Sequence, residues 1–276
     1  MIFDGRAFAR EMEEVVKVKV AGMAVKPKVV SILVGNDPAS ELYTRLKKQA
    51  AERVGIDFVI HRYTNESLNH LKAEIAGIGA KGDVTGLMVQ LPVPGLSPAK
   101  TQDILAAIPL DKDVDGLRWE TSRVAPATVR AVLAILERIK KMSDRYSQML
   151  TGKYVVVGYR GAVGEPLVEF LRKAKLDVDG VEWDTPDPGR IVAGADVIIS
   201  CTGKAGLITG EMVRDGVIAV DVGSPKGDMT QEVYAKASVA VAVPGGVGPV
   251  TIASLMQNAV ELLPDDESRG SRSSVL

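Results

Sequence analysis

Short apolar runs and longer amphipathic stretches alternate along most of this chain. The apolar runs are rich in Val and Ile and predict strands at residues 28–34, 58–63, 85–91, 153–157, 177–181, 197–200, 217–222 and 239–243. The amphipathic stretches predict helices at residues 8–24, 40–54, 67–78, 98–107, 127–141, 165–174 and 252–263. Ser40 is expected to cap the second helix and Gly55 to end it. Strands that alternate with helices form parallel sheets with covered faces, so the pattern predicts an α/β protein.

The alternation is interrupted between Gly116 and Ala127 and then restarts. A chain of 276 residues is long enough for two domains with separate cores. We therefore expect two mainly parallel sheets flanked by helices, the second of the Rossmann type, with a cleft between the domains. The first domain is expected at residues 1–120 plus a C-terminal helix at about 252–264, the second at residues 121–251, and a disordered tail at residues 265–276.

Composition narrows the functional classes. The formal net charge of −1 argues against a nucleic-acid or anionic-membrane surface, and no apolar run approaches the roughly 20 residues that span a bilayer. The single cysteine, Cys201, excludes an internal disulfide and fits a reducing compartment, so we expect a cytoplasmic protein. One cysteine and two histidines provide no metal-ligand constellation, and we expect no metal site.

A loop rich in glycine and proline follows the last predicted strand. Residues 244–251 contain three glycines and two prolines and end in Thr251. Glycines allow the backbone to approach a flat ligand closely, and prolines stiffen the loop. Thr251 is expected to cap the helix that follows. Open α/β sheets bind ligands at the carboxyl ends of their strands, so we expect this loop to line a ligand site.

A second glycine-rich turn follows the predicted strand at residues 153–157. Gly158, Gly161 and Gly164 lie between that strand and a predicted helix. Backbone N–H groups at such a helix N-terminus can hold the pyrophosphate of a dinucleotide. The spacing differs from the usual Gly-x-Gly-x-x-Gly, so the prediction rests on the strand and the helix around the turn.

The charged residues near this turn leave the cofactor open. Glu182 and Asp184 follow the next strand, and an acid there suits the ribose 2′-hydroxyl of NAD. Arg160, inside the turn, instead suits the 2′-phosphate of NADP.

Four residues of the first domain are candidates for chemistry: Tyr43, Lys47, Gln90 and Asp115. Tyr43 and Lys47 are four residues apart on a predicted helix, so they share one face. Burial lowers the pKa of a lysine and can make it an acid or base near neutrality, and a tyrosine ring can stack on a flat ligand. Gln90 ends an apolar strand, where its amide needs a hydrogen-bonding partner. A solvated lysine and a plain turn aspartate are the alternatives for Lys47 and Asp115.

Six segments carry a wider pattern. They are residues 34–40 with Tyr43 and Lys47, residues 86–94, residues 112–116, Val163-Gly164-Glu165-Pro166, Asp221-Val222-Gly223, and residues 244–251. In this order they resemble the bifunctional methylenetetrahydrofolate dehydrogenase/methenyltetrahydrofolate cyclohydrolase family, and the likeness runs from about Asp4 to Leu263. The resemblance implies oxidation of 5,10-methylenetetrahydrofolate with NADP, or with NAD as the alternative, and then hydrolysis to 10-formyltetrahydrofolate. It also implies a reduced folate substrate, a homodimer and a place in one-carbon metabolism.

The resemblance also implies roles for individual residues. Lys47 matches the catalytic lysine, Tyr43 the tyrosine that stacks on folate, Gln90 the glutamine that hydrogen-bonds near the lysine, and Asp115 the carboxylate that anchors the pterin. Pro244, Gly245 and Gly246 would lie beside the folate. The residues expected to bind the dinucleotide are Gly158, Tyr159, Arg160, Gly161, Ala162, Val163, Asp184, Thr202, Gly203, Ser224 and Thr251.

This chain departs from the family pattern at the dinucleotide site. The family usually has Gly-Arg-Ser in the phosphate turn, where this chain has Gly158-Tyr159-Arg160, and a His-Ser pair near the position of Glu182 and Asp184. Both changes affect the 2′-phosphate site. The family's Pro-Cys-Thr-Pro is reduced to Pro126-Ala127-Thr128-Val129. Two other hypotheses stay open: a dehydrogenase without the hydrolytic step, and a dinucleotide-binding protein without catalysis.

Overall fold

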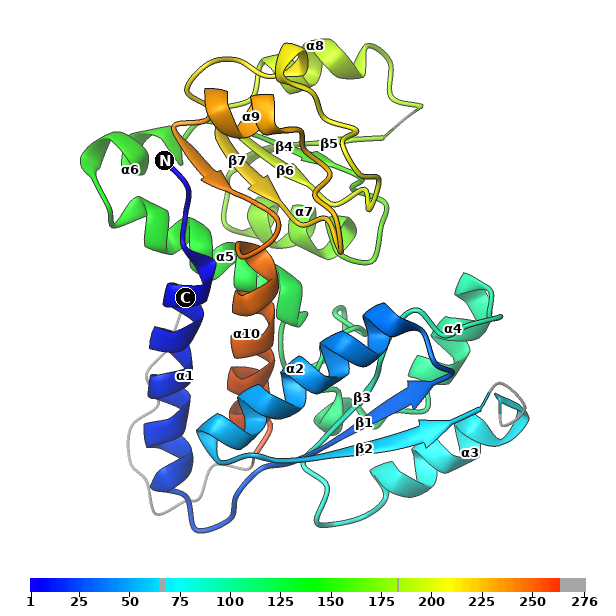
Figure 1. Cartoon of the computed structure of the whole chain (residues 1–276). Coiled ribbons are helices and arrows are strands. Elements are labelled where there is room, and N and C mark those ends of the chain that lie inside the picture. Colours follow the sequence, from blue (N-terminus) through cyan, green and yellow to red (C-terminus); the bar gives the residue numbers. More distant parts are fainter. Residues whose placement is uncertain (65–67, 183, 264–276) are drawn as a thin grey trace.

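The computed structural model describes residues 1–64, 68–182 and 184–263, so the tail expected at residues 265–276 lies outside the described residues. Two parallel sheets form two lobes, and long helices connect them (Figure 1). The predicted α/β class with two sheets flanked by helices is confirmed. No helix in the described part of the chain is both long and apolar enough to cross a membrane.

The smaller lobe contains a three-stranded sheet in the order β2-β1-β3. Its strands are β1 (Lys28–Val34), β2 (Asp57–Tyr63) and β3 (Gly86–Val89), and its helices are α2 (Pro38–Val54), α3 (Leu68–Gly79), α4 (Pro98–Leu105) and the short 3-10 helix η2 (Leu110–Lys112). One face of the sheet packs on α3 through Ile32 and Leu71, and the other packs on α2 through Val29 and Ala50. The alternating side chains of the strands thus bury both faces.

Helix α2 begins before the predicted cap. The Asp37 carboxylate accepts a hydrogen bond from the Ser40 N–H at 2.8 Å, and Pro38 occupies the first turn. The expectation that Ser40 caps this helix is therefore wrong, because an aspartate followed by proline is the stronger start signal. The expected end at Gly55 is confirmed, since Gly55 has a φ of 82° in the left-handed region.

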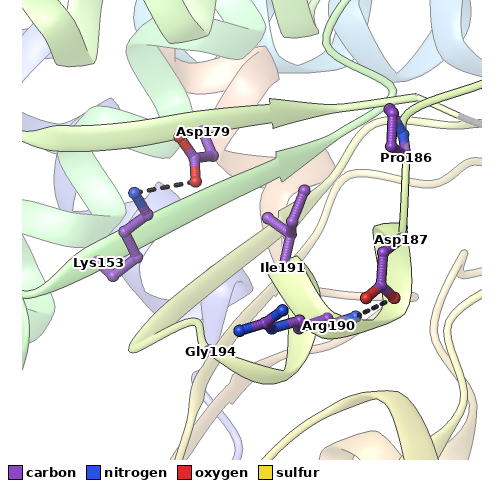
Figure 2. A pocket seen from close by; sticks show the side chains of 7 residues that line it. All are labelled: Lys153, Asp179, Pro186, Asp187, Arg190, Ile191 and Gly194. Carbon is purple, nitrogen blue, oxygen red and sulfur yellow. Dashed lines mark hydrogen bonds and ion pairs between the residues drawn. The ribbon is translucent and has the colours of Figure 1, made fainter.

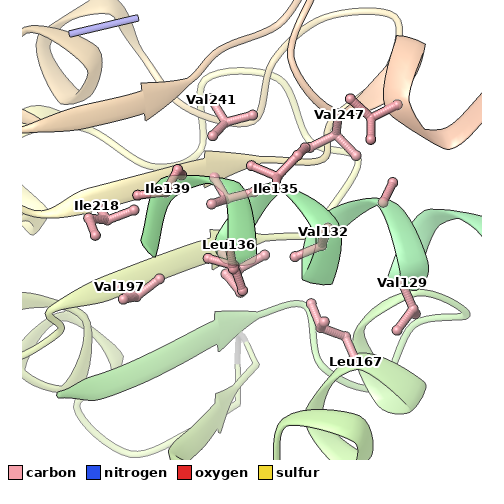
Figure 3. Close-up of a cluster of buried hydrophobic side chains, with 14 of the residues drawn as sticks. Val129, Val132, Ile135, Leu136, Ile139, Leu167, Val197, Ile218, Val241 and Val247 are labelled. Carbon is pink, nitrogen blue, oxygen red and sulfur yellow. The ribbon is translucent and has the colours of Figure 1, made fainter. Parts of the chain in front are cut away.

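The larger lobe contains a five-stranded sheet in the order β5-β4-β6-β7-β8. Its strands are β4 (Lys153–Val157), β5 (Asp177–Val181), β6 (Val197–Ser200), β7 (Ile218–Asp221) and β8 (Val239–Val241). Helices α5 (Ala127–Lys140) and α7 (Gly164–Lys173) cover one face, and α8 (Pro188–Ala193) and α9 (Gln231–Lys236) cover the other; α6 (Asp144–Met149) and the 3-10 helix η3 (Gly210–Met212) complete the lobe. Figure 3 shows the first of these faces, where Ile139 of α5 lies beside Ile218 of the sheet.

Helices α1 (Gly5–Ala21), α5 and α10 (Val247–Glu261) connect the two lobes. Val250 of α10 packs in the core of the larger lobe, whereas Met256 packs in the core of the smaller one. The fully buried Asn258 donates hydrogen bonds to the backbone oxygens of Val114 and Ala125, at 3.0 and 2.9 Å. The last helix therefore contacts the cores of both lobes.

Helix α10 begins earlier than predicted. Gly246 precedes its first residue, and Pro249 lies in its first turn. Thr251 is inside the helix, where its hydroxyl donates to the Val247 oxygen at 3.2 Å. The expected cap at Thr251 is therefore wrong, because the proline fits a first turn and extends the helix to Val247.

Candidate active site

Lys47 and Gln90 form a buried hydrogen-bonded pair in the smaller lobe. Lys47 lies on the face of α2 that packs against the sheet, and Gln90 follows β3 directly. Each is only 8% exposed, and Lys47 Nζ donates to Gln90 Oε1 at 3.0 Å. Gln90 Nε2 donates in turn to the Leu91 oxygen at 2.9 Å, which turns the amide oxygen toward the lysine. The predicted need of Gln90 for a partner is met by Lys47.

Burial lowers the pKa of Lys47, and the carboxylate of Asp115 opposes this shift in part. The lysine therefore has a neutral amide as its hydrogen-bond partner and a carboxylate in its wider surroundings. Asp115 is half-buried in the loop before α5, and its backbone oxygen accepts from the Ala127 N–H at 3.1 Å. The glycine after it, Gly116, has a φ of 67°, and a Cβ there would lie 2.7 Å from the Ala125 oxygen. This close approach of the backbone fixes the loop that carries Asp115.

Tyr43 lies at the junction of the two lobes. It precedes Lys47 by one turn of α2, and its hydroxyl is 2.6 Å from the hydroxyl of Ser224, which follows β7 of the larger lobe. A Cβ on Gly248 of α10 would lie 3.9 Å from the same Tyr43 oxygen. Elements of both lobes and a connecting helix therefore meet at this tyrosine.

The glycine loop after β8 is held by close backbone packing. Gly245 has a φ of 103°, and a Cβ on Gly246 would lie 2.6 Å from the Ala242 oxygen. Gly5, at the start of α1, packs so closely on the loop that a Cβ there would lie 2.6 Å from the Gly245 oxygen. Larger residues do not fit at these positions, which explains the glycines. The peptide bond before Pro244 is cis.

The predicted dinucleotide turn has the expected strand–turn–helix geometry. Gly158 follows β4 with a φ of 80°, and a Cβ on it would lie 3.0 Å from the Cys201 oxygen. A Cβ on Gly164, the first residue of α7, would lie 2.6 Å from Tyr159 Cα. Gly161 closes the turn, its N–H donating to the Gly158 oxygen at 3.2 Å. Ala162 and Val163 complete the turn before the helix.

A cavity of about 390 Å³ adjoins this turn. Gly158, Arg160, Gly161, Glu182, Cys201, Thr202 and Lys204 are among its lining residues. Glycines beside a cavity and the N-terminus of the ten-residue helix α7 suit the backbone contacts that a pyrophosphate needs. The residues present therefore fit a dinucleotide.

Arg160, Glu182 and Asp184 come together beside this cavity. Arg160 Nη1 lies 3.0 and 2.9 Å from the two carboxylate oxygens of Asp184. The backbone N–H of Arg160 donates to Glu182 Oε1 at 2.7 Å. The guanidinium holds the pKa of Asp184 below its usual range. Its carbon lies 5.5 Å from the centre of the Tyr159 ring, which itself packs on Gly180 of β5. Arg160, which suits NADP, and the two acids, which suit NAD, thus lie together, and their opposite charges partly neutralise each other.

Two buried aspartates, Asp221 and Asp228, organise the loops next to the cavity and were not predicted as site residues. Asp221 accepts from the N–H groups of Gly223, Asp228 and Met229 and from the Tyr234 hydroxyl, at 2.6 to 3.0 Å. Asp228 Oδ2 accepts from the Ser200 hydroxyl and from the N–H groups of Thr202 and Gly203. The signal in the sequence was an acid at the end of the apolar run Ile218–Asp221.

A second cavity, of about 460 Å³, lies at β4, β5 and α8 (Figure 2). Its charged residues are Lys153, Asp179, Asp187 and Arg190. Lys153 Nζ is already engaged by Asp177 and Asp179 at 2.9 Å each, and Asp187 caps α8. None of the lining residues was a predicted site residue.

The two lobes, the glycine turn at the cavity and the buried Lys47–Gln90 pair of the smaller lobe define a two-lobed α/β protein with a Rossmann-type dinucleotide-binding lobe. Residues 3–115 match the family model for the tetrahydrofolate dehydrogenase/cyclohydrolase catalytic domain. Residues 126–266 match the model for the NAD(P)-binding domain of the same family. The chain therefore belongs to the tetrahydrofolate dehydrogenase/cyclohydrolase family, which confirms the resemblance seen in the sequence.

Individual members of the family are similar to this chain over nearly its full length. The bifunctional protein FolD of Lactobacillus gasseri is 35% identical over an alignment that covers 97% of this chain and 99% of that protein. The crystal structure of the bifunctional enzyme FolD from Campylobacter jejuni has a TM-score of 0.82 at 33% identity and covers 95% of this chain and 98% of that one. The dehydrogenase-cyclohydrolase of Trypanosoma brucei, complexed with NADP and an inhibitor, has a TM-score of 0.83 at 28% identity, covering 95% and 96%.

Proposed function

We propose that Tyr43, Lys47, Gln90 and Asp115 form the folate site of a bifunctional methylenetetrahydrofolate dehydrogenase and methenyltetrahydrofolate cyclohydrolase. Family membership supports both activities. The enzyme oxidises 5,10-methylenetetrahydrofolate to the methenyl form with NADP and hydrolyses that product to 10-formyltetrahydrofolate. Among the residue assignments, the buried Lys47–Gln90 pair at 3.0 Å is the observation that carries the proposal.

Lys47 suits the proton transfers of the hydrolytic step. Its pKa is lowered by burial, so a larger fraction of the amine is unprotonated near neutrality than for a lysine in water. Unprotonated Nζ can take a proton from the water that adds to the methenyl carbon. The same proton can then pass to the ring nitrogen as its bond to that carbon breaks. A neutral partner is important here, because a carboxylate at the position of Gln90 Oε1 would raise the pKa of the lysine.

The other residues of the folate site suit binding and orientation. The Tyr43 ring offers a face for stacking, and the Asp115 carboxylate can accept the paired N–H groups of the pterin edge. Pro244, Gly245 and Gly246 would form the opposite wall by backbone contact.

NADP, the cofactor that the family's NAD(P)-binding domain and a relative's NADP complex support, would supply the hydride acceptor. Gly158, Tyr159, Arg160, Gly161, Ala162 and Val163 would hold it at the turn, with Asp184, Thr202, Gly203, Ser224 and Thr251 completing the predicted set. Gly158, Arg160, Gly161 and Thr202 line the cavity beside the turn, which supports these four assignments. Arg160 would have to leave Asp184 to meet a 2′-phosphate, whereas Glu182 could accept a ribose hydroxyl directly.

Initial rates with the purified protein test the function. We expect oxidation of methylenetetrahydrofolate with NADP, and the rate with NAD is measured for comparison. We also expect hydrolysis of methenyltetrahydrofolate, which is followed by its ultraviolet absorbance. Oxidation without hydrolysis would favour a dehydrogenase that has lost the second step. Dinucleotide binding without turnover of any reduced folate would favour a non-catalytic protein. A homodimer is also proposed from the family resemblance, and a cytoplasmic location from the single cysteine. Sedimentation equilibrium tests the dimer.

A further inference from the structure

Asp228 is a fully buried aspartate in the loop between β7 and α9. One of its oxygens, Oδ2, accepts three hydrogen bonds: from the Ser200 hydroxyl at 2.8 Å, the Thr202 N–H at 2.7 Å and the Gly203 N–H at 3.2 Å. Ser200 ends β6, and Thr202 and Gly203 lie near the start of the loop that follows. A single carboxylate oxygen thus fixes the whole start of the β6 loop.

This loop faces the dinucleotide cavity, because Thr202 is among the cavity's lining residues. The N–H groups of Thr202 and Gly203 are directed at Asp228 and are used there. They are therefore not free to bind a phosphate. The loop can contact a ligand in the cavity only through its other atoms, because Asp228 holds these two N–H groups.

Asp228 also contacts the first residues of its own loop, which follows β7. A Cβ on Gly223 would lie 2.6 Å from both the backbone nitrogen and Oδ1 of Asp228, so no side chain fits between them. Asp221 Oδ1 accepts from the N–H groups of both residues, at 2.8 Å from Gly223 and 3.0 Å from Asp228. Ser224, the next residue, meets Tyr43 of the other lobe. Asp228 thus joins the β6 loop at the cofactor cavity to its own loop, whose Ser224 reaches Tyr43 of the other lobe.

We infer that Asp228 is a positioning residue for hydride transfer: it holds the β6 and β7 loops in one arrangement, so that a dinucleotide at the Gly158 turn faces a folate at Tyr43. This inference rests on the proposed function. Loss of Asp228 should therefore impair the dehydrogenase and spare the cyclohydrolase. Hydrolysis of methenyltetrahydrofolate depends on Lys47 and Gln90 in the other lobe and needs no dinucleotide.

The test compares three variants with the parental protein. Asp228→Ala removes every hydrogen bond to Oδ2. Asp228→Asn keeps the shape and can present its amide oxygen to the same three donors, with its nitrogen at the position of Oδ1, which has no hydrogen-bond partner among the described residues. Asp215→Ala is the matched control, because Asp215 is in the same lobe and its side chain is 88% exposed. For each protein we would measure the NADP Kd by equilibrium binding without folate, the dehydrogenase kcat and KM for NADP, the cyclohydrolase rate and the Tm.

Asp228→Ala is expected to raise the NADP Kd and KM by about tenfold and to lower the dehydrogenase kcat by a similar factor. Its cyclohydrolase rate should stay within about twofold of the parental rate, and Asp228→Asn should recover most of the NADP affinity. An unchanged Kd and dehydrogenase rate in Asp228→Ala would overturn the inference. A parallel fall of both activities in both Asp228 variants, following a lower Tm, would also overturn it by showing a structural role only. Absence of dehydrogenase activity in the parental protein would instead refute the proposed function.

Discussion

The hydroxyl groups of Tyr43 and Ser224 lie 2.6 Å apart and form a hydrogen bond between the two lobes. Tyr43 belongs to α2 of the smaller lobe, and Ser224 follows β7 of the larger one. Tyr43 is proposed to bind the folate and Ser224 to bind the dinucleotide. One polar contact therefore links the two proposed ligand sites directly.

This contact predicts that Tyr43→Phe and Ser224→Ala have the same effect. Each removes one hydroxyl of the pair, while Tyr43→Phe keeps the ring for stacking. We expect each to lower the dehydrogenase kcat/KM by about two- to fivefold, which corresponds to one hydrogen bond with partial solvent exposure. The double variant should lose no more than either single variant, because the second change removes a bond that is already absent. Losses that multiply in the double variant would contradict the coupling.

Gln90→Glu is predicted to shift the pH dependence of hydrolysis upward. It places a carboxylate at an atom that is 3.0 Å from Lys47 Nζ. A negative charge there favours the ammonium form, so the pKa of Lys47 rises and the unprotonated fraction near neutrality falls. We expect the cyclohydrolase kcat at about pH 7 to fall at least tenfold and the rising limb of the pH–rate profile to move to higher pH.

Asp115→Asn is predicted to shift the same limb in the opposite direction. The Asp115 carboxylate raises the pKa of Lys47 against the effect of burial, so its removal lowers that pKa further. The limb should then move to lower pH, while the KM for folate rises because the pterin anchor is lost. If neither substitution moves the limb, Lys47 is not the group that titrates.

Asp184→Asn is predicted to increase the preference for NADP over NAD. The substitution releases Arg160 from an ion pair at 2.9 Å and makes its guanidinium available to a 2′-phosphate. Both side chains are more than half exposed, so the effect should be small, and we expect the ratio of the two kcat/KM values to rise about two- to fivefold. Asp215→Asn serves as the control for charge in the same lobe. A ratio that is unchanged or lower in Asp184→Asn would show that the ion pair does not restrict NADP.

The strands and the long helices could be predicted from the sequence because each is long enough to show the apolar run or repeat that is typical of its type. Helices α6, α8 and α9 were missed, since six residues are too few to show that period. The caps at Ser40 and Thr251 were wrong for one reason: a proline earlier in the chain allowed each helix to begin sooner. The domain boundaries near residues 120 and 252 stay predictions.

The candidate site was predicted in part for similar reasons. Helical spacing places Tyr43 and Lys47 on one face of α2, which is local information. The pairing of Lys47 with Gln90 and the contact of Tyr43 with Ser224 join residues far apart in the chain, so periodicity alone does not reveal them. Asp228 was missed because its role consists only of such contacts, with Ser200 and Thr202 as the main partners.

The central claim is that the buried amine of Lys47 performs the proton transfers of hydrolysis. The most direct test is the rate of methenyltetrahydrofolate hydrolysis by Lys47→Met, with Lys48→Met as the control on the exposed face of the same helix. We predict a fall of at least about 100-fold for Lys47→Met, an unchanged NADP Kd, and a rate within about twofold of the parental rate for Lys48→Met. Hydrolysis by Lys47→Met at the parental rate would contradict the account.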